Sequence, residues 1–176
     1  MMFQTPLSNT TSGSLKFVVA PASDHALGLD FQKLTSYLST NIGIAIELIY
    51  CDSYAEAINA FRMGAAQLGW LGHYAYHELA SEDLIEPFAV GLPKGKDTPN
   101  YQSLVLTQIT TDLKKLSNLK NIRIAIGDKH STSGYIVPKD YLSEAGIDLD
   151  NVSQFKSVFR VKNHDEALLY LVNGDV

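Results

Sequence analysis

The chain has 176 residues, of which 45% are hydrophobic and 19% are charged, and its formal net charge is −5. This balance is typical of a folded globular protein and excludes a largely disordered chain. The acidic net charge, with no cluster of Lys or Arg, argues against nucleic acid as a partner. The single cysteine, Cys51, excludes an internal disulfide framework and an all-cysteine metal site.

The N-terminal segment 1–14 is polar and rich in Ser and Thr, and we expect it to be a disordered or leader-like tail. It lacks the basic and then apolar pattern of a secretory signal peptide. No apolar run in the chain approaches the ~20 residues that span a bilayer. These patterns alone do not decide where the protein works.

After this tail, short apolar runs alternate with segments whose apolar residues recur at helical spacing. The apolar runs predict strands and the periodic segments predict helices, the second of which opens with the capping pattern Ser53-Tyr54-Ala55-Glu56. The alternation predicts a parallel α/β sheet. The expected strands cover 15–20, 44–50, 67–72, 87–91 and 101–108, and the expected helices cover about 24–41, 53–64 and 73–80.

A second α/β unit begins near Asp112. Pro138 lies inside one of its helical patterns, so we expect that helix to bend or to start later. We therefore predict two lobes, a first over 15–106 and a second over 107–176. In the second lobe the expected helices cover 113–116, 132–145 and 164–172, and the expected strands cover 122–126 and 155–161.

Two segments of the chain, 53–66 and 163–176, resemble one another. In the first lobe this helical pattern leads into the strand that begins at Gln67, whereas the chain stops at Val176 where the equivalent strand is expected. We interpret the chain as the front part of a two-lobed protein, with a truncated second lobe. Chance similarity between two amphipathic helices is the alternative.

The run Ser131-Thr132-Ser133-Gly134 follows a predicted strand and opens a predicted helix. The first N–H groups of a helix lack intrahelical partners and attract an oxyanion, and three hydroxyls add further donors. Gly134 allows close approach of the backbone. The simpler interpretation is that one of these hydroxyls caps the helix. Because one cap needs one hydroxyl, the run predicts an oxyanion-binding site.

Other chemistries suit the sequence less well. The Gly-x-x-x-x-Gly-Lys-Ser/Thr pattern of a nucleotide-binding loop is absent. A nucleophilic serine, with His130 or His164 as its base, is a weaker alternative because the Gly-x-Ser-x-Gly elbow is also missing. His73 and His77 are four residues apart on an expected helix, but without a carboxylate motif we favour a lobe-lining role over metal binding.

Three further side chains are candidates for the same oxyanion site. His164 opens a helix after a strand, at the sheet edge where α/β proteins bind ligands, and its imidazole suits an oxyanion. A solvated helix start is the alternative for this residue. Tyr54 opens the corresponding helix of the first lobe, and Tyr101 follows a flexible loop, so each can offer a phenol donor.

Taken together, several segments resemble the phosphonate/phosphite/phosphate substrate-binding proteins of ABC transporters. The most specific is Ser131-Thr132-Ser133-Gly134 followed by Tyr135-Ile136-Val137-Pro138, and the similarity extends over nearly the whole chain. The other matching segments are Asp52 to Ala57, Leu68 to Gly72, Pro99 to Ser103, and Asn163 to Val176.

The resemblance implies a type II periplasmic-binding-protein-like fold that closes around its ligand. It implies a non-enzymatic solute-binding protein, without cofactor or metal, that is periplasmic or extracellular and membrane-associated and works with an ABC permease. In such proteins the phosphorus oxyanion is held by residues matching Ser131, Thr132, Ser133, His164, Tyr54 and Tyr101. A sensory input domain of the same fold is the alternative function, and the oligomeric state stays open.

Overall fold

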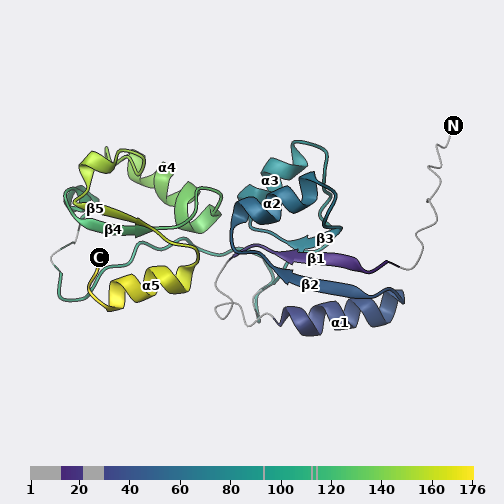
Figure 1. Ribbon diagram of the computed structural model, residues 1–176. Coiled ribbons are helices and arrows are strands. Elements are labelled where there is room, and N and C mark those ends of the chain that lie inside the picture. The colour runs from purple at the N-terminus through teal and green to yellow at the C-terminus, as the bar shows by residue number, and fades with distance from the viewer. Residues whose placement is uncertain (1–12, 22–29, 93, 112, 114) are drawn as a thin grey trace.

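Two parallel β-sheets, each flanked by helices, make up the computed structural model, which describes residues 13–21, 30–92, 94–111, 113 and 115–176 (Figure 1). The first sheet has the strand order β2-β1-β3 and the second pairs β4 with β5, all in parallel. This confirms the predicted parallel α/β organisation. The strands are β1 (Leu15–Val19), β2 (Ile46–Tyr50), β3 (Leu68–Trp70), β4 (Arg123–Ile126) and β5 (Ser157–Arg160).

Helices cover both faces of each sheet (Figure 1). Helix α1 packs on one face of the first sheet and α2 and α3 on the other, while α4 and α5 lie on opposite faces of the second sheet. In the described part of the chain, no helix is long and apolar enough to cross a membrane. The helices are α1 (Phe31–Ile42), α2 (Tyr54–Arg62), α3 (His73–Ala80), α4 (Val137–Ser143) and α5 (His164–Val172).

The central strand β1 divides the first lobe into two apolar layers. Successive side chains of a strand point to opposite faces of its sheet. Phe17 and Val19 pack with Phe31 of α1, while Val18 packs with Ile58 of α2 on the other face. All five side chains are buried, so the middle of this sheet is closed to water on both faces.

The second lobe has a core of its own, formed mainly on the α4 side of its sheet. It is built around the buried side chains of Ile126, Tyr135, Leu142, Ile147 and Phe155. Helix α5 has no fully buried residue, and its clearest ring contact is between Tyr170 and Phe159, whose centroids lie 4.9 Å apart. The two lobes therefore hold separate cores, although the boundary between 106 and 107 stays a prediction.

Two of the predicted strands, 87–91 and 101–108, are wrong. Both segments are irregular, and the described chain pairs no other strand with them. Strand propensity reflects packing against neighbours, so an apolar run without a partner strand has no ladder to join. Large apolar side chains are exposed here as a result, with Phe88 at 71% and Leu104 at 69%.

Some helix boundaries also differ from the sequence prediction. The first helix begins at Phe31, where Asp30 caps it by accepting from the Lys33 N–H at 2.9 Å, and residues 24–29 lie outside the described chain. Of the expected helix at 113–116, residue 114 lies outside the described chain, 113 and 115 are not helical, and a 3-10 turn spans Leu116–Leu119. The expected tail at 1–14 falls almost wholly outside the described residues.

Pro138 shifts a helix start, as predicted. A π-helical turn spans Thr132–Ile136 and continues directly into α4, which begins at Val137. Proline is tolerated in the first helical turn, because its missing N–H would have no intrahelical partner there.

The internal repeat is a structural one. Ser53 accepts from the Glu56 N–H at 3.1 Å to cap α2, and Asn163 accepts from the Glu166 N–H at 2.8 Å to cap α5. Each glutamate in turn accepts from the backbone N–H that precedes its cap residue, at 2.7 Å in both helices. Tyr54 and His164 consequently occupy the same first helical position in the two lobes.

The burial pattern predicts opposite outcomes for two leucine substitutions. Leu79 is fully buried in the last turn of α3, so Leu79→Ala should lower the free energy of unfolding by ~2–5 kcal/mol. Leu104→Ala, in the exposed segment, should change it by less than ~0.5 kcal/mol. Urea denaturation followed by circular dichroism measures both, and a large loss for Leu104→Ala would show that the segment is packed.

Candidate functional site

The segments that follow the strands of both sheets meet between the lobes. The β4 strand leads into the Ser131–Gly134 turn, and β3 leads into the start of α3. The Thr132 hydroxyl accepts from the backbone N–H of Tyr74 at 2.9 Å, which joins the two lobes directly. This is the edge where open α/β sheets bind ligands, and the predicted site residues gather here.

Ser131 is the capping residue of its turn. Its side chain accepts from the Gly134 N–H at 3.1 Å, and the residue is only 4% exposed. The Ser131 N–H donates to the Asp128 carbonyl at 2.9 Å, which fixes the loop before the turn. The Ser131 hydroxyl therefore serves as the helix cap, which was the simpler interpretation of one hydroxyl in this run.

Gly134 packs its backbone against that of Gly127. The Gly127 N–H donates to the Gly134 carbonyl at 3.0 Å. A Cβ at Gly127 would meet the Gly134 Cα at 3.1 Å, and a Cβ at Gly134 would meet the Ser131 hydroxyl at 2.8 Å. A side chain at Gly134 would therefore displace a neighbour, and one at Gly127 would crowd the backbone, which agrees with the close approach that the sequence indicated for Gly134.

The turn leaves donors available to a ligand. Within the described chain, the backbone N–H groups of Thr132 and Ser133 have no acceptor, as is usual for the first N–H groups of a helix. The Thr132 hydroxyl accepts from Tyr74, which leaves its own O–H free to donate. Two backbone amides and one hydroxyl of the turn are thus free to donate to a ligand.

His164 lies beside this turn. Its Nε2 atom is 3.2 Å from the Ser133 hydroxyl, and the residue is exposed at the first position of α5. A ring nitrogen that carries a proton here would add a donor next to the two open amides. The structure therefore brings His164 and Ser133 together, as the sequence reasoning expected.

Tyr54 approaches from the first lobe. The residue is 5% exposed, and this burial raises the pKa of its phenol, while a hydrogen bond with the Ser131 side chain acts in the opposite direction. The phenol consequently keeps its proton across the physiological range and remains a donor. A Cβ at Gly72 would lie 3.8 Å from the Tyr54 hydroxyl and 3.7 Å from the Thr132 hydroxyl, so both groups border the same space beside Gly72.

Tyr101 contacts His73, a residue at the start of α3 beside the site. Its hydroxyl is 3.2 Å from Nδ1 of His73, and the two rings lie 5.5 Å apart with their planes at 33°. Tyr101 is 51% exposed, which leaves it accessible from solvent. In the same irregular segment, the Ser103 hydroxyl donates to the Ser133 carbonyl at 2.6 Å and ties that segment to the turn.

Sequence reasoning expected a lobe-lining role for His73 at the start of α3, but it missed the hydrogen bond that joins this helix start to Thr132. Gly72 is the residue before the helix and provides no side-chain cap, so the helix N-terminus is capped by Thr132 from the other lobe. The absence of Ser, Thr, Asp or Asn before His73 was the available signal. His73 contacts Tyr101, and in the described ranges no three His, Cys, Asp or Glu side chains are arranged so that they could hold a metal ion.

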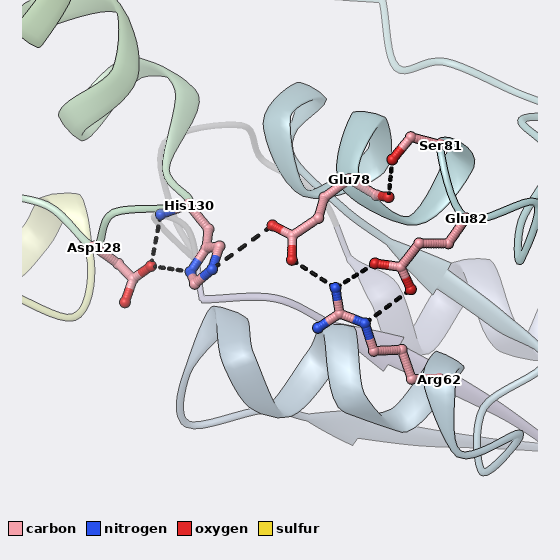
Figure 2. Close-up of polar contacts among 6 residues, drawn as sticks. All are labelled: Arg62, Glu78, Ser81, Glu82, Asp128 and His130. Atoms are coloured by element: carbon pink, nitrogen blue, oxygen red, sulfur yellow. Dashed lines mark hydrogen bonds and ion pairs between the residues drawn. The ribbon is translucent and has the colours of Figure 1, made fainter.

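A second group of side chains adjoins the site (Figure 2). An open cleft of about 960 Å³ lies between the lobes and is lined from both sides, with Tyr54, Tyr74 and Glu78 on the first and Asp128 and His130 on the second. The His130 ring lies between the carboxylates of Asp128 and Glu78 (Figure 2). It is thus turned toward acids, unlike the serine-activating base that the hydrolase alternative required.

Comparison with solved structures identifies the class of fold. A binding protein component of an ABC phosphonate transporter from Pseudomonas aeruginosa matches with a TM-score of 0.78 at 23% identity, covering 94% of this chain and 56% of that one. PhnD1 from Prochlorococcus marinus, in complex with methylphosphonate, matches with a TM-score of 0.67 at 20% identity, covering 94% and 62%. The chain therefore has the predicted type II periplasmic-binding-protein fold.

The family follows from the sequence. Residues 17–176 match the family described as ABC transporter, phosphonate, periplasmic substrate-binding protein, and the chain belongs to this family. It is 23% identical, over 98% of its length, to a probable ABC transporter phosphite binding protein of Prochlorococcus marinus. It is 24% identical, over 97% of its length, to the phosphate-import protein PhnD of Mycolicibacterium smegmatis. The chain spans 59% and 56% of these two relatives.

The close packing at Gly134 predicts a cost for any side chain there. Gly134→Ala should displace the Ser131 hydroxyl from its cap and lower the free energy of unfolding by ~1–2 kcal/mol. Gly72→Ala is the matched control, because its Cβ would make only ordinary contacts at 3.7 Å or more. Urea denaturation of both variants tests this, and equal stabilities would contradict the described packing.

Proposed function

We propose that this chain captures a phosphorus oxyanion (a phosphonate, phosphite or phosphate) between its two lobes. It would act as the solute-binding component of an ABC transporter, as a periplasmic or an extracellular, membrane-associated protein that delivers its ligand to a permease. The observation that carries the proposal is the Ser131–Gly134 turn, where the open N–H groups of Thr132 and Ser133 lie beside His164 and the first lobe's Tyr54.

The donor set suits a small tetrahedral anion. Each oxygen of a phosphonate, phosphite or phosphate can accept more than one hydrogen bond. Charge-assisted hydrogen bonds contribute about 1.5–3 kcal/mol each. The amides of Thr132 and Ser133, the Thr132 hydroxyl and the Tyr54 phenol are the donors that we assign, with His164 completing the set. Tyr101 is proposed to close the exposed side, where it is held by His73.

Contacts across the lobes support capture by closure. Tyr54 lies in the first lobe and the serine turn in the second, under the predicted division into 15–106 and 107–176. The Thr132 hydroxyl already connects them through the Tyr74 N–H. An anion bound at this point would contact both lobes and stabilise the closed arrangement by its differential affinity.

The arrangement favours reversible binding over hydrolysis. The Ser133 hydroxyl and His164 Nε2 are within 3.2 Å, as a nucleophile and its base would be. A hydrolytic triad also needs a group that orients the other ring nitrogen. Over the residues that the structure describes, no side chain hydrogen bonds to Nδ1 of His164. We therefore propose that the chain is not an enzyme.

Calorimetric titration tests the proposed function. Phosphate, phosphite, methylphosphonate and 2-aminoethylphosphonate should be compared with methylsulfonate, which carries three oxygens but one charge less when the phosphonate is fully ionised. At least one phosphorus oxyanion should bind with micromolar or tighter affinity, equivalent to about −8 kcal/mol. Binding of a ligand without phosphorus, together with no response to the four oxyanions, would show that the assignment is wrong.

Thr132 provides a sharper test of the site. Thr132→Val removes a donor at constant shape and should weaken binding by ~1–3 kcal/mol, whereas Thr132→Ser keeps the hydroxyl and should stay near wild type. The dissociation constants of the three proteins, measured with the same oxyanion, decide the matter. If Thr132→Val binds as tightly as wild type, the Thr132 hydroxyl does not donate to the ligand.

A further inference from the structure

Helices α2 and α5 occupy equivalent places in the two lobes. In each lobe, the N–H of the residue after the second strand donates to the last carbonyl of the first strand at 3.0 Å, from Cys51 to Val19 and from Val161 to Ile126. Both helices have nine residues and the same pattern of capping. Residues of α2 and α5 can therefore be compared position by position, and Ile58 and Leu168 are the fifth residue of each.

In the first lobe, α2 is covered by the unit that follows it, strand β3 and helix α3. Ile58 is buried in a cluster that also contains Ala75 and Leu79 of α3. Phe61 of α2 lies against β3, because a Cβ at Gly69 would meet the Cζ atom of its ring at 2.7 Å. The apolar side of α2 is therefore closed to water by a strand and a helix together.

The same side of α5 is open. Leu168 is 48% exposed, whereas the equivalent Ile58 is 1% exposed. Leu169 and Val172 are exposed as well, at 59% and 70%. These three α5 residues lie within five consecutive positions of one helix, so their side chains form one apolar face. An exposed group of large apolar side chains is typical of an interaction surface.

The sheet beside α5 has an open edge at the equivalent place. Strand β1 pairs with both β2 and β3, whereas over the described residues β4 pairs with β5 alone. The Ala20 N–H donates to the Trp70 carbonyl at 3.1 Å, on the β3 side of β1. Alternate residues of a strand bond to opposite neighbours, so Val18 faces β3 as well. Ala125 is its counterpart in β4, since each precedes the last residue of its strand, and its N–H and carbonyl face the open edge. Such an edge can accept a further strand.

The first lobe indicates what occupies this position. There, one parallel strand pairs with the central strand and the helix after it covers α2. The two solved relatives share the fold, and this chain spans 56% and 62% of them. Their chains thus contain further polypeptide, in addition to the part that matches the two lobes described here.

One position of α5 defines the chemistry of the missing contact. Arg62, the ninth residue of α2, forms ion pairs with Glu78 and Glu82 of α3 (Figure 2). The ninth residue of α5 is Val172, which carries no charge. A glutamate placed against Val172 would lose water without gaining a partner. A helix that covers α5 is therefore expected to present an apolar side chain where α3 has Glu78.

We propose that the apolar face of α5 and the open edge of β4 bind a strand-and-helix unit equivalent to β3 and α3. Its strand runs parallel to β4, and its helix covers Leu168 and Val172 with apolar side chains. The unit belongs to the part of the family fold that this chain does not span. The proposal does not depend on the proposed oxyanion function, and its test needs no oxyanion.

Two labelled peptides test the chemistry of the occupant. Each contains residues 65–82 of this chain, which include β3 and α3, with two lysines added for solubility. One peptide keeps Glu78 and the other carries Glu78→Leu. Fluorescence anisotropy should show saturable binding of the Glu78→Leu peptide to the full chain, about 5-fold or more tighter than binding of the unchanged peptide. Absence of saturable binding, or equal affinity for the two peptides, would overturn the proposal.

Substitutions in the chain test the location. Leu168→Glu and Val172→Glu each place a charge on the apolar face and should weaken binding of the Glu78→Leu peptide about 10-fold or more. Both positions are exposed, so circular dichroism should show that both variants stay folded. Val152→Glu is the matched control, because Val152 is 64% exposed in the same lobe but lies in a 3-10 turn outside α5. Its affinity should stay within about 2-fold of wild type. Equal weakening in all three variants would place the peptide elsewhere.

Two further measurements separate the remaining outcomes. Exchange of the Ala125 amide hydrogen, followed by NMR, should slow about 10-fold or more when the peptide is bound, because a new strand covers this edge. Unchanged exchange would contradict strand pairing. Light scattering gives the mass of the chain alone. A dimer that Leu168→Glu converts to a monomer would show that a second copy covers α5, and would overturn the proposed occupant.

Discussion

The close backbone approach of Gly127 and Gly134 is the constraint on which the site depends. Their N–H to carbonyl bond at 3.0 Å brings the end of β4 against the turn that opens the next helix. Because neither residue has a side chain, the turn folds tightly, and Ser131 is left inside it as a cap. Thr132 and Ser133 are then presented toward the other lobe with their amides open.

The two lobes contribute to the site through the same local design. In each lobe a polar side chain caps one helix, and a glutamate of that helix accepts from the backbone N–H that precedes the cap residue. The first residue of each helix is a tyrosine or a histidine, whose ring carries a polar atom. Tyr54 and His164 are these rings, so an equivalent backbone geometry places a phenol on one side and an imidazole on the other. The family's shared fold accounts for the framework, while these particular side chains carry the proposed chemistry.

Local patterns predicted most of the fold, and long-range contacts did not follow from them. Helices α3 and α5 occupy the ranges expected from periodicity, since capping and spacing are written into adjacent residues. The segment at 101–108 was wrongly predicted as a strand because its apolar composition could not reveal that a partner strand was missing. The turn and its rings were recognisable from motifs, but the Tyr74 to Thr132 contact and the approach of Glu78 to His130 arise only when the lobes meet.

The cap that Thr132 provides to α3 has a consequence for the backbone of the first lobe. A helix normally carries its own cap, but here the Tyr74 amide is protected by a hydroxyl from the other lobe. Whenever the lobes part, this amide must turn to water instead. The rate at which this amide exchanges its hydrogen with deuterated solvent therefore reports how often the two lobes separate.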